Sequence, residues 1–459
     1  MLIAASLAAF VTPFMSAAVN VALPSIGREL GASTGLMSWV ATSFLLAAAV
    51  LLVPLGKLAD IRGRRKLFAA GMAVFSVASL ACVFAPSVPV LIALRAAQGI
   101  GGAMIYGTGT ALLTSVFPAG ERGRALGINV GTTYIGLSIG PFLGGLLTQH
   151  LGWRSLFLAA AVIGLAGLAV TLAGVRGEWA EAKGERFDLT GSLVYTAGLL
   201  AFMGGLAVLP AAAGIALLIG GAACLSGFAL LERRVAHPVL SIALFRGNPV
   251  FTFSNLAALI SYSATFSVSY LMSLYLQEVR GMSPQSAGLL LVCQPVLQAA
   301  FSPVSGRLSD RVQPRILASL GMLLCACGLA LLAFINATTG LGIAVAGLAV
   351  LGVGFALFSS PNTNAVMGAV ERRSLGVASA TLSTMRLLGQ TLSMAMVMVA
   401  FTLSMGGSSI APASFPGFLR AMRVVLLIGA ALSAVGIFAS LARGRVGPVP
   451  EPAEGRSQR

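Results

Sequence analysis

Fourteen long apolar runs, separated by short polar segments, limit what this chain can fold into. A helix needs about 20 apolar residues to cross the hydrocarbon core of a bilayer, and unpaired backbone groups cannot face lipid. The runs therefore predict fourteen membrane-spanning helices in an all-α polytopic membrane protein. They lie near residues 5–25, 36–56, 67–85, 90–116, 125–147, 154–174, 190–209, 211–231, 250–276, 284–305, 314–335, 340–367, 374–402 and 419–442.

Two polar segments of similar sequence each lie between two of these runs. Residues 56–66 read Gly-Lys-Leu-Ala-Asp-Ile-Arg-Gly-Arg-Arg-Lys, and residues 306–315 read Gly-Arg-Leu-Ser-Asp-Arg-Val-Gln-Pro-Arg. Internal duplication within an apolar chain is typical of transporters that are built from two related helix bundles. The sequence therefore predicts two related halves, each with a basic turn at the same membrane face.

The net charge of +16 records membrane topology rather than a polyanionic partner. Most of the 29 Lys and Arg residues fall in the even-numbered loops and in the C-terminal tail. Cytoplasmic loops retain Lys and Arg, so we expect both termini in the cytoplasm and no nucleic-acid partner. The first run lacks a basic segment before it, and we interpret it as a span rather than as a cleaved signal peptide. We expect the tail, 443–459, to be disordered.

The sequence offers no pattern for enzymatic or ATP-driven chemistry. It lacks the Gly-x-x-x-x-Gly-Lys-[Ser/Thr] phosphate loop, and its five cysteines and two histidines lack the spacing of a metal site. The glycine-rich segment 99–102 lies inside an apolar run, where helix packing explains it better than nucleotide binding. We therefore predict that the chain is not an enzyme and binds no cofactor or metal.

Three motifs resemble those of the major facilitator superfamily, and specifically its fourteen-helix drug:proton antiporters of the EmrB and QacA type. Residues 56–66 are similar to the Gly-x-Leu-Ala-Asp-x-x-Gly-Arg-Arg/Lys motif, and residues 95–99 to the Arg-x-x-Gln-Gly motif. The third is the antiporter motif of this family, which the chain resembles in Gly136, Gly140, Pro141, Gly144 and Gly145. The resemblance implies two six-helix bundles, 1–175 and 248–442, with a linker and two inserted helices at 176–247.

The resemblance also implies a latch that closes an inner gate. We expect Gly56 and Gly63 to permit tight turns, and Asp60 to pair with Arg64 or with a neighbouring helix end. In the second half, Asp310 and Arg311 stand at the matching positions. The antiporter motif implies a bend at Pro141 that shapes the cavity. Segment 174–189 is interpreted as a solvated linker.

Two arginines lie within spans, where a charge is costly and needs a partner or water. The resemblance assigns Arg95 a part in proton transfer, and Arg386 is its polar counterpart in the second half. Polar residues are concentrated in particular spans, which predicts a cavity. Our candidates for lining it are Met15, Asn20, Gln98, Tyr106, Asn129, Tyr134, Asn255, Tyr262, Gln294, Gln298, Asn362 and Arg386.

One departure from the antiporter pattern affects the prediction of proton coupling. Met15 stands where these antiporters commonly carry an aspartate, and the acidic residues lie in loops, in the tail or at span ends. Asp60 and Glu278, together with Arg95, are the remaining candidates for proton transfer. We predict a plasma-membrane exporter of small, largely apolar compounds that acts as a monomer and is driven by a proton gradient. The alternatives are a facilitator or exporter of neutral or anionic metabolites without such coupling, and a transport-inactive sensor or scaffold.

Overall fold

The computed structural model describes residues 1–31, 34–209, 211–235, 238–240, 243–282, 284–405 and 415–444, and all regular structure within them is helical. The predicted tail lies outside the described residues from residue 445 onwards. The elements, in chain order, are α1 (Leu2–Leu30), α2 (Thr34–Arg62), α3 (Arg64–Val83), α4 (Val88–Val116), α5 (Ala119–Leu151), α6 (Arg154–Gly174), α7 (Leu189–Val208), α8 (Ala212–Leu231), α9 (Ala243–Arg246), α10 (Pro249–Thr265), α11 (Val268–Leu274), the π-helix η1 (Tyr275–Val279), α12 (Pro284–Leu291), α13 (Cys293–Ser309), α14 (Pro314–Ala333), α15 (Leu341–Gly368), the 3-10 helix η2 (Arg372–Ser374), α16 (Leu375–Met405) and α17 (Phe415–Ala442).

The prediction of fourteen membrane-spanning helices is confirmed, because 14 helical segments of the described chain are long and apolar enough to cross a bilayer. Two predicted spans are interrupted. The ninth divides into α10 and α11, where the backbone amide of Ser267 bonds to the Ser393 hydroxyl at 3.0 Å instead of within a helix. The tenth divides into α12 and α13 at Val292.

The basic turn after the second span is shorter than the sequence predicts. Helix α2 continues to Arg62 and α3 begins at Arg64, so Gly63 alone makes the turn, with a φ of +115° that favours glycine. The prediction that Gly56 lies in a turn is wrong, because Gly56 lies inside α2. Its missing side chain instead lets α16 approach, since a Cβ at Gly56 would lie 2.6 Å from the Gly376 carbonyl oxygen.

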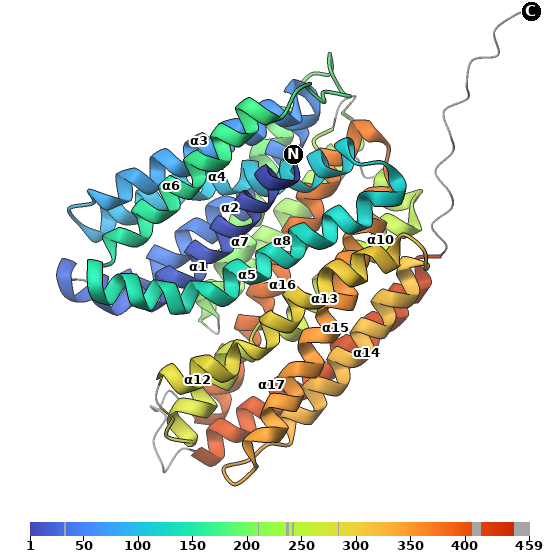
Figure 1. Ribbon diagram of the computed structural model, residues 1–459. Coiled ribbons are helices and arrows are strands. Elements are labelled where there is room, and N and C mark those ends of the chain that lie inside the picture. Colours follow the sequence, from blue (N-terminus) through green and yellow to red (C-terminus); the bar gives the residue numbers. More distant parts are fainter. Residues whose placement is uncertain are drawn as a thin grey trace, which may run out of the picture.

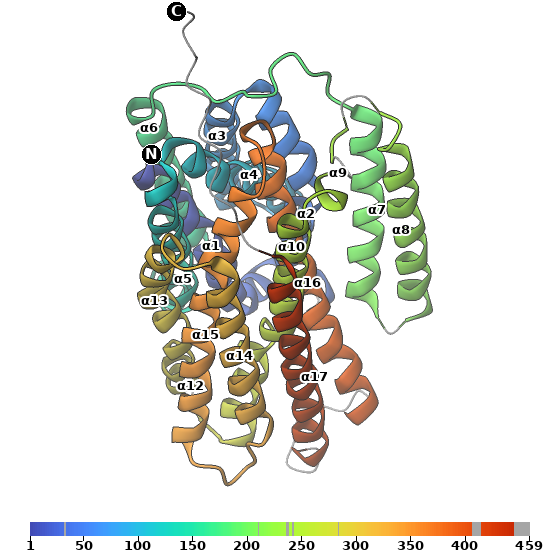
Figure 2. The ribbon, with the colours of Figure 1, turned by 90° about the vertical axis from the view of Figure 1, so that its right-hand side faces the viewer.

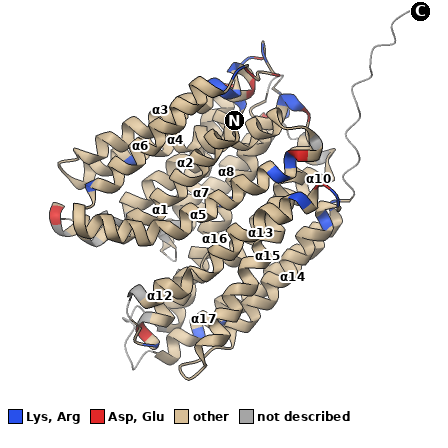
Figure 3. Cartoon of the chain, viewed as in Figure 1, with Lys and Arg blue, Asp and Glu red and all other residues tan. Residues whose placement is uncertain are grey.

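The helices form two groups that meet at one end of the molecule. Helices α1–α6 pack mainly on one another, and so do α10–α17 (Figure 1). The ribbons of the two groups lie close together at the upper right of Figure 1 and diverge towards the lower left. Most Lys and Arg residues lie at the end where the groups meet, which we call the basic face (Figure 3). The other end is the opposite face.

Helices α7 and α8 pack against each other at the side of the molecule (Figure 2). Helix α7 also contacts α2 from the first group and α16 from the second. The chain reaches this pair through residues 175–188, which cross the basic face from α6 to α7. The boundaries that we placed at 175, 247 and 442 stay a prediction.

The opposite face has its own polar contact within the first group. Arg154 forms an ion pair with Glu29 and donates to the Val83 carbonyl oxygen at 3.0 Å. Trp153 donates from Nε1 to the second oxygen of Glu29 at 2.7 Å. The hydrogen bond from Arg154 holds the pKa of Glu29 below its ordinary value. These contacts join the ends of α1, α3 and α6.

Candidate functional site

The strongest polar contact between the two helix groups is built around Asp60, near the end of α2. Arg64 donates to Asp60 Oδ1 from Nε at 2.9 Å and from Nη2 at 2.7 Å, and both side chains are fully buried. The same carboxylate accepts the backbone amides of Gly376 at 2.8 Å and of Val377 at 3.0 Å. These amides belong to the first turn of α16, where the helix dipole favours a negative charge. We call these four residues the Asp60 contact.

Arg64 extends the Asp60 contact to two further elements. It donates to the Ser115 hydroxyl at 2.9 Å, and to the backbone carbonyl of Arg372, which precedes α16. The sequence predicted Arg64 or a neighbouring helix end as the partner of Asp60. In the structure Asp60 bonds to both, and the helix end is that of α16, which the sequence could not identify.

A related contact lies where α13 ends. Asp310 accepts the backbone amides of Gly123 at 3.0 Å and of Arg124 at 3.3 Å, in the first turns of α5. Burial raises the pKa of Asp310 above its ordinary value, and the bonds from the two amides oppose that rise. The Arg311 side chain is exposed, and the hydrogen bonds and ion pairs of the described residues do not include one between Arg311 and Asp310. The Asp310 contact is thus a carboxylate at a helix end.

Close glycine packing accompanies the Asp310 contact. A Cβ at Gly306 would lie 2.2 Å from the Gly123 carbonyl oxygen and 3.0 Å from the Gly127 Cα. Backbone atoms cannot rotate away as a side-chain end can. Helices α5 and α13 therefore touch backbone to backbone at the basic face.

Residues 175–188, which we call the strap, bind the turn beside the Asp60 contact. Trp179 accepts the Arg64 amide at 2.9 Å through its backbone oxygen, and Ala182 donates its amide to the Asp60 carbonyl at 3.0 Å. Lys57 forms an ion pair with Glu185 at 2.5 Å. Many residues of this segment are exposed, as expected of a solvated linker, but its backbone also pairs with the residues that make the contact between groups.

Glu178 of the strap caps the start of α3. Its two carboxylate oxygens accept the amides of Arg65 at 2.9 Å and of Lys66 at 3.2 Å, which are orphan donors of a helix N-terminus. A Cβ at Gly63 would lie 2.4 Å from the Glu178 carboxyl carbon. Gly63 is thus required by its φ and by the approach of Glu178. The four acidic residues of segment 178–188 were the only signal in the sequence for such pairing.

Arg95 is buried inside the first helix group, with 1% of its surface exposed. Its Nε donates to the Val40 carbonyl oxygen at 3.0 Å, and its Nη1 donates to Gln98. The guanidinium lies 4.7 Å from the centre of the Phe44 ring, a favourable cation–π position. The expectation that Arg95 has partners is met by neutral groups of α2 and α4, and its role in proton transfer stays a prediction.

Arg386 lies among aromatic side chains from several helices. It donates to the Thr363 hydroxyl at 2.6 Å, and its guanidinium is 5.8 Å from the Tyr262 ring centre. Phe355 stands edge-on to Tyr262 at 5.0 Å and to Tyr134 of α5 at 5.9 Å. Three predicted cavity residues are thus brought together where α5 faces the second group. We call Tyr134, Tyr262, Phe355 and Arg386 the aromatic cluster.

Several other predicted cavity residues serve helix packing. Met15 is 0% exposed and packs in the hydrophobic core of the first group, and its place in a cavity stays a prediction. Asn362, 1% exposed, donates to the Ser254 carbonyl oxygen at 3.1 Å and joins α15 to α10. Its place in a cavity also stays a prediction.

The remaining candidates are distributed over both groups. Asn129 donates to the Ala5 carbonyl oxygen at 3.1 Å, and Asn255 to the Phe251 carbonyl oxygen of its own helix at 2.9 Å. Gln98 donates to the Ser79 hydroxyl at 2.6 Å. Gln294 and Gln298 are buried on α13, and Asn20 and Glu278 are exposed. The backbone oxygen of Tyr106 accepts from the Ser379 hydroxyl at 3.1 Å, between the two groups.

Helix α5 uses its glycines on two different neighbours. The antiporter-motif glycines pack on α1: a Cβ at Gly136 would lie 2.4 Å from the Phe10 carbonyl oxygen, and one at Gly144 would lie 2.7 Å from the Ala18 Cα. Gly140 also contacts α1, and Gly145 lies at ordinary distance from Val21. Pro141 lies inside α5, and a bend there stays a prediction. The glycines of the antiporter motif therefore set the approach of α1.

Arg443 is a buried arginine that the sequence analysis did not single out. It donates from Nη1 to the Ser254 hydroxyl at 3.1 Å and to Asn362 Oδ1 at 3.0 Å, and from Nε to the Ser440 carbonyl oxygen at 2.8 Å. These acceptors are neutral, and burial lowers the pKa of Arg443 to about 10. Arg443 ties the end of α17 to α10 and α15.

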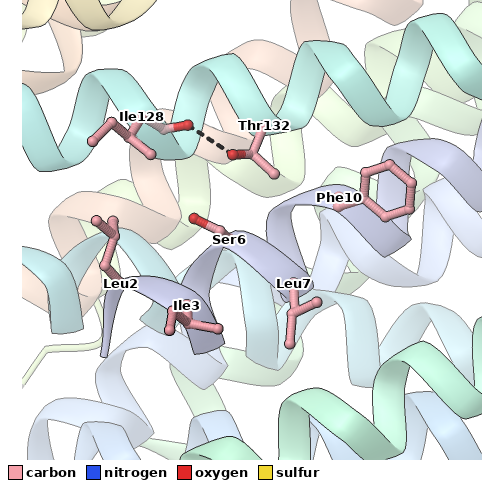
Figure 4. Close-up of a pocket in the computed structure, with 7 residues that line it drawn as sticks. All are labelled: Leu2, Ile3, Ser6, Leu7, Phe10, Ile128 and Thr132. Carbon is pink, nitrogen blue, oxygen red and sulfur yellow. Dashed lines mark hydrogen bonds between the residues drawn. The ribbon is translucent and has the colours of Figure 1, made fainter.

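A groove lined by residues of α1 and α5 lies in the first helix group. It has a volume of about 450 Å³, and Thr132 bonds back to the Ile128 carbonyl at 2.9 Å rather than into it (Figure 4). It is lined by Leu2, Ile3, Ser6, Leu7, Phe10, Ile128 and Thr132. A second groove of about 340 Å³ lies between α5 and α13, beyond their glycine contact.

The sequence profile of the Major Facilitator Superfamily matches residues 5–394. The chain belongs to the major facilitator superfamily. It is therefore a transporter with this superfamily's all-α fold and not an enzyme, as the motifs predicted. As an integral membrane protein of this superfamily, it has a small-molecule substrate.

Individual superfamily members support this assignment. The chain is 33% identical over 401 residues to the multidrug resistance protein Stp of Mycobacterium tuberculosis (strain ATCC 25618 / H37Rv). The matched region covers 86% of this chain and 74% of Stp. It is 33% identical over 422 residues to the cephamycin export protein CmcT of Amycolatopsis lactamdurans, covering 90% and 86%. The structure of the proton:xylose symporter XylE bound to 6-bromo-6-deoxy-D-glucose matches with a TM-score of 0.67 over 95% of this chain and 94% of XylE, at 15% identity. That likeness concerns the fold alone.

Proposed function

We propose that this superfamily member exports small, largely apolar compounds across the plasma membrane by alternating access. The observation that carries the proposal is the Asp60 contact, in which a fully buried carboxylate of one helix group holds the first turn of α16 in the other. Transporters switch by breaking such contacts between rigid bundles. The names of Stp and CmcT, a multidrug resistance protein and an export protein, support the outward direction.

In this proposal the basic face is cytoplasmic, since cytoplasmic loops retain Lys and Arg. The Asp60 and Asp310 contacts then form the inner gate, and the structure corresponds to its closed state. Bundles 1–175 and 248–442 rock against each other, and the contacts of α5 with α13 and of α2 with α16 at the basic face break when this gate opens. The monomer is the transporting unit, and both termini are cytoplasmic.

We also propose proton antiport as the driving force, with no bound cofactor. The resemblance to drug:proton antiporters supports it. Within the described spans, Asp60 supplies a buried carboxylate, which lies near the basic face. Four hydrogen-bond donors already bind this carboxylate. Proton exchange is therefore assigned to groups near the membrane boundaries.

The aromatic cluster supports a preference among substrates. A lipophilic cation needs a carboxylate or a free aromatic face to offset its desolvation. The Arg386 guanidinium already lies 5.8 Å from the centre of the Tyr262 ring, so this aromatic face is not free for a cationic substrate. Arg386 would repel a cation and attract an anion, while Tyr134 and Phe355 offer apolar surface.

We therefore expect neutral and anionic amphiphiles to be exported in preference to permanent dications. The test is efflux from cells that produce the protein, with a series of fluorescent compounds that share one scaffold and carry a charge from −1 to +2. Arg386→Gln should weaken the export of the anion and leave that of the neutral compound nearly unchanged. Faster export of the dication than of the neutral compound would contradict this substrate class, and no export of any member would contradict the exporter.

A further inference from the structure

Two carboxyl groups converge at the basic-face ends of the α7–α8 pair. Asp188 is the N-cap of α7, and its Oδ1 accepts the Gly191 amide at 2.9 Å. Glu232 directly follows α8, and its Oε1 accepts the Val239 amide at 3.3 Å. Because the two helices are antiparallel neighbours, the start of one lies beside the end of the other.

Gly191 shows how close these carboxyl groups are. A Cβ at Gly191 would lie 2.3 Å from Asp188 Oδ2 and 2.5 Å from Glu232 Oε1. Both oxygens thus occupy the space that any larger residue would fill. The absence of a side chain at Gly191 is what allows the two acidic groups to meet.

Each of these carboxyl groups keeps one buried oxygen without a partner. Asp188 Oδ2 and Glu232 Oε2 have no hydrogen-bond partner among the described residues, and Glu232 is only 3% exposed. Leaving a buried acceptor unsatisfied is costly, and two neighbouring carboxylates cannot both stay ionised away from water. A single proton on the pair removes one of the two negative charges and turns one carboxylate oxygen into a hydrogen-bond donor.

The charged surroundings do not neutralise the pair. Lys57 of α2 is the nearby cation, but it is already paired with Glu185 of the strap at 2.5 Å. Arg233 and Arg234, which follow α8, have exposed side chains, as does Arg186 before α7. Burial and the charge of Asp188 raise the pKa of Glu232, while the amides of Val239 and Leu240 and the charge of Lys57 oppose the rise, and the net pKa is about 7.

We infer that Asp188 and Glu232 form a proton-binding site that holds one proton between two carboxyl groups at the ends of α7 and α8. The proton comes from water at the basic face and returns to it on deprotonation. Lys57 lies one helical turn before Asp60, so the site adjoins the Asp60 contact. Within the proposed antiport, and resting on that proposal, this site is where the transported proton is exchanged with the cytoplasm.

The proton site can be tested without transport. Infrared spectra of the purified full-length protein in nanodiscs, recorded over a pH series, should show the carbonyl band of a protonated carboxyl that disappears with a midpoint near 7. Glu232→Gln should remove this band. Asp188→Asn should move the midpoint to lower pH, because a neighbouring negative charge is lost. Lys57→Met should move it to higher pH, which tests the site even if Glu232→Gln does not fold.

The matched control is Glu181→Gln, an exposed acidic residue of the strap, which should leave the band unchanged. A band that survives Glu232→Gln, or the lack of any carboxyl titration near neutral pH, would overturn the proton site. In proteoliposomes, Glu232→Gln should abolish the effect of a pH gradient on export while leaving exchange of substrate across the membrane. If the band behaves as expected but export ignores the gradient, the proton site stands and the proposed antiport fails.

Discussion

Asp60→Asn is expected to reduce transport by about tenfold or more while the protein still inserts and folds. The substitution removes the negative charge from a fully buried pair and leaves the Arg64 guanidinium facing a neutral amide. Removing one partner of a buried ion pair costs about 3–5 kcal/mol, and each 1.4 kcal/mol is about tenfold in an equilibrium. The loss is concentrated on the state in which Asp60 also holds the amides of Gly376 and Val377.

The measurement is substrate uptake into membrane vesicles, normalised to the amount of folded protein found by gel filtration. Lys66→Gln is the matched control, because it removes one charge from an exposed position in the same turn. This control should transport at nearly the parent rate. Equal transport by Asp60→Asn and the parent would remove the latch role from Asp60.

Gly306→Ala is expected to prevent the inner gate from closing and to reduce transport by about tenfold. The added methyl group would lie 2.2 Å from the Gly123 carbonyl oxygen, and backbone atoms can yield only if α5 and α13 separate. Overpacking of this kind costs about 1–3 kcal/mol. Alanine favours a helix over glycine by about 1 kcal/mol, so α13 itself should not be weakened.

Spin labels at the basic-face ends of α5 and α13 would report the separation directly, as a longer distance in Gly306→Ala than in the parent. Gly288→Ala is the control within the same span, because a Cβ there meets no atom within 4 Å. If the two variants give the same distance and the same transport rate, the glycine contact is not part of the gate.

The sequence predicted the spans well because a membrane demands long apolar runs, and it indicated the Asp60–Arg64 pair because the two residues lie four positions apart in the basic turn. It could not predict that α16 supplies the other donors. Lipid-facing and protein-facing residues are both apolar in a membrane, so the sequence pattern does not show which side of a helix meets which neighbour. For this reason the sequence did not show that Met15 and Asn362 pack inside their own helix groups.

Long-range backbone pairing explains the other failures. Gly56 reads as a turn residue, yet its role depends on Gly376, which lies far along the chain. The strap reads as a charged loop, yet Trp179 and Ala182 use backbone atoms to bind the turn, and backbone groups are the same in every sequence. Arg443 follows the last span like an ordinary topological charge, and only the fold surrounds it with neutral acceptors.

Proton-driven export against a concentration gradient is the activity that we propose for this protein. Its most direct measurement uses proteoliposomes with an acidic interior, clamped membrane potential and a neutral substrate that has no titratable group, so that pH alone cannot trap it. We expect the substrate to accumulate inside while the pH gradient lasts, to leak back when an ionophore collapses that gradient, and not to accumulate with Asp60→Asn. Accumulation of the substrate that is the same with and without the pH gradient would contradict the claim.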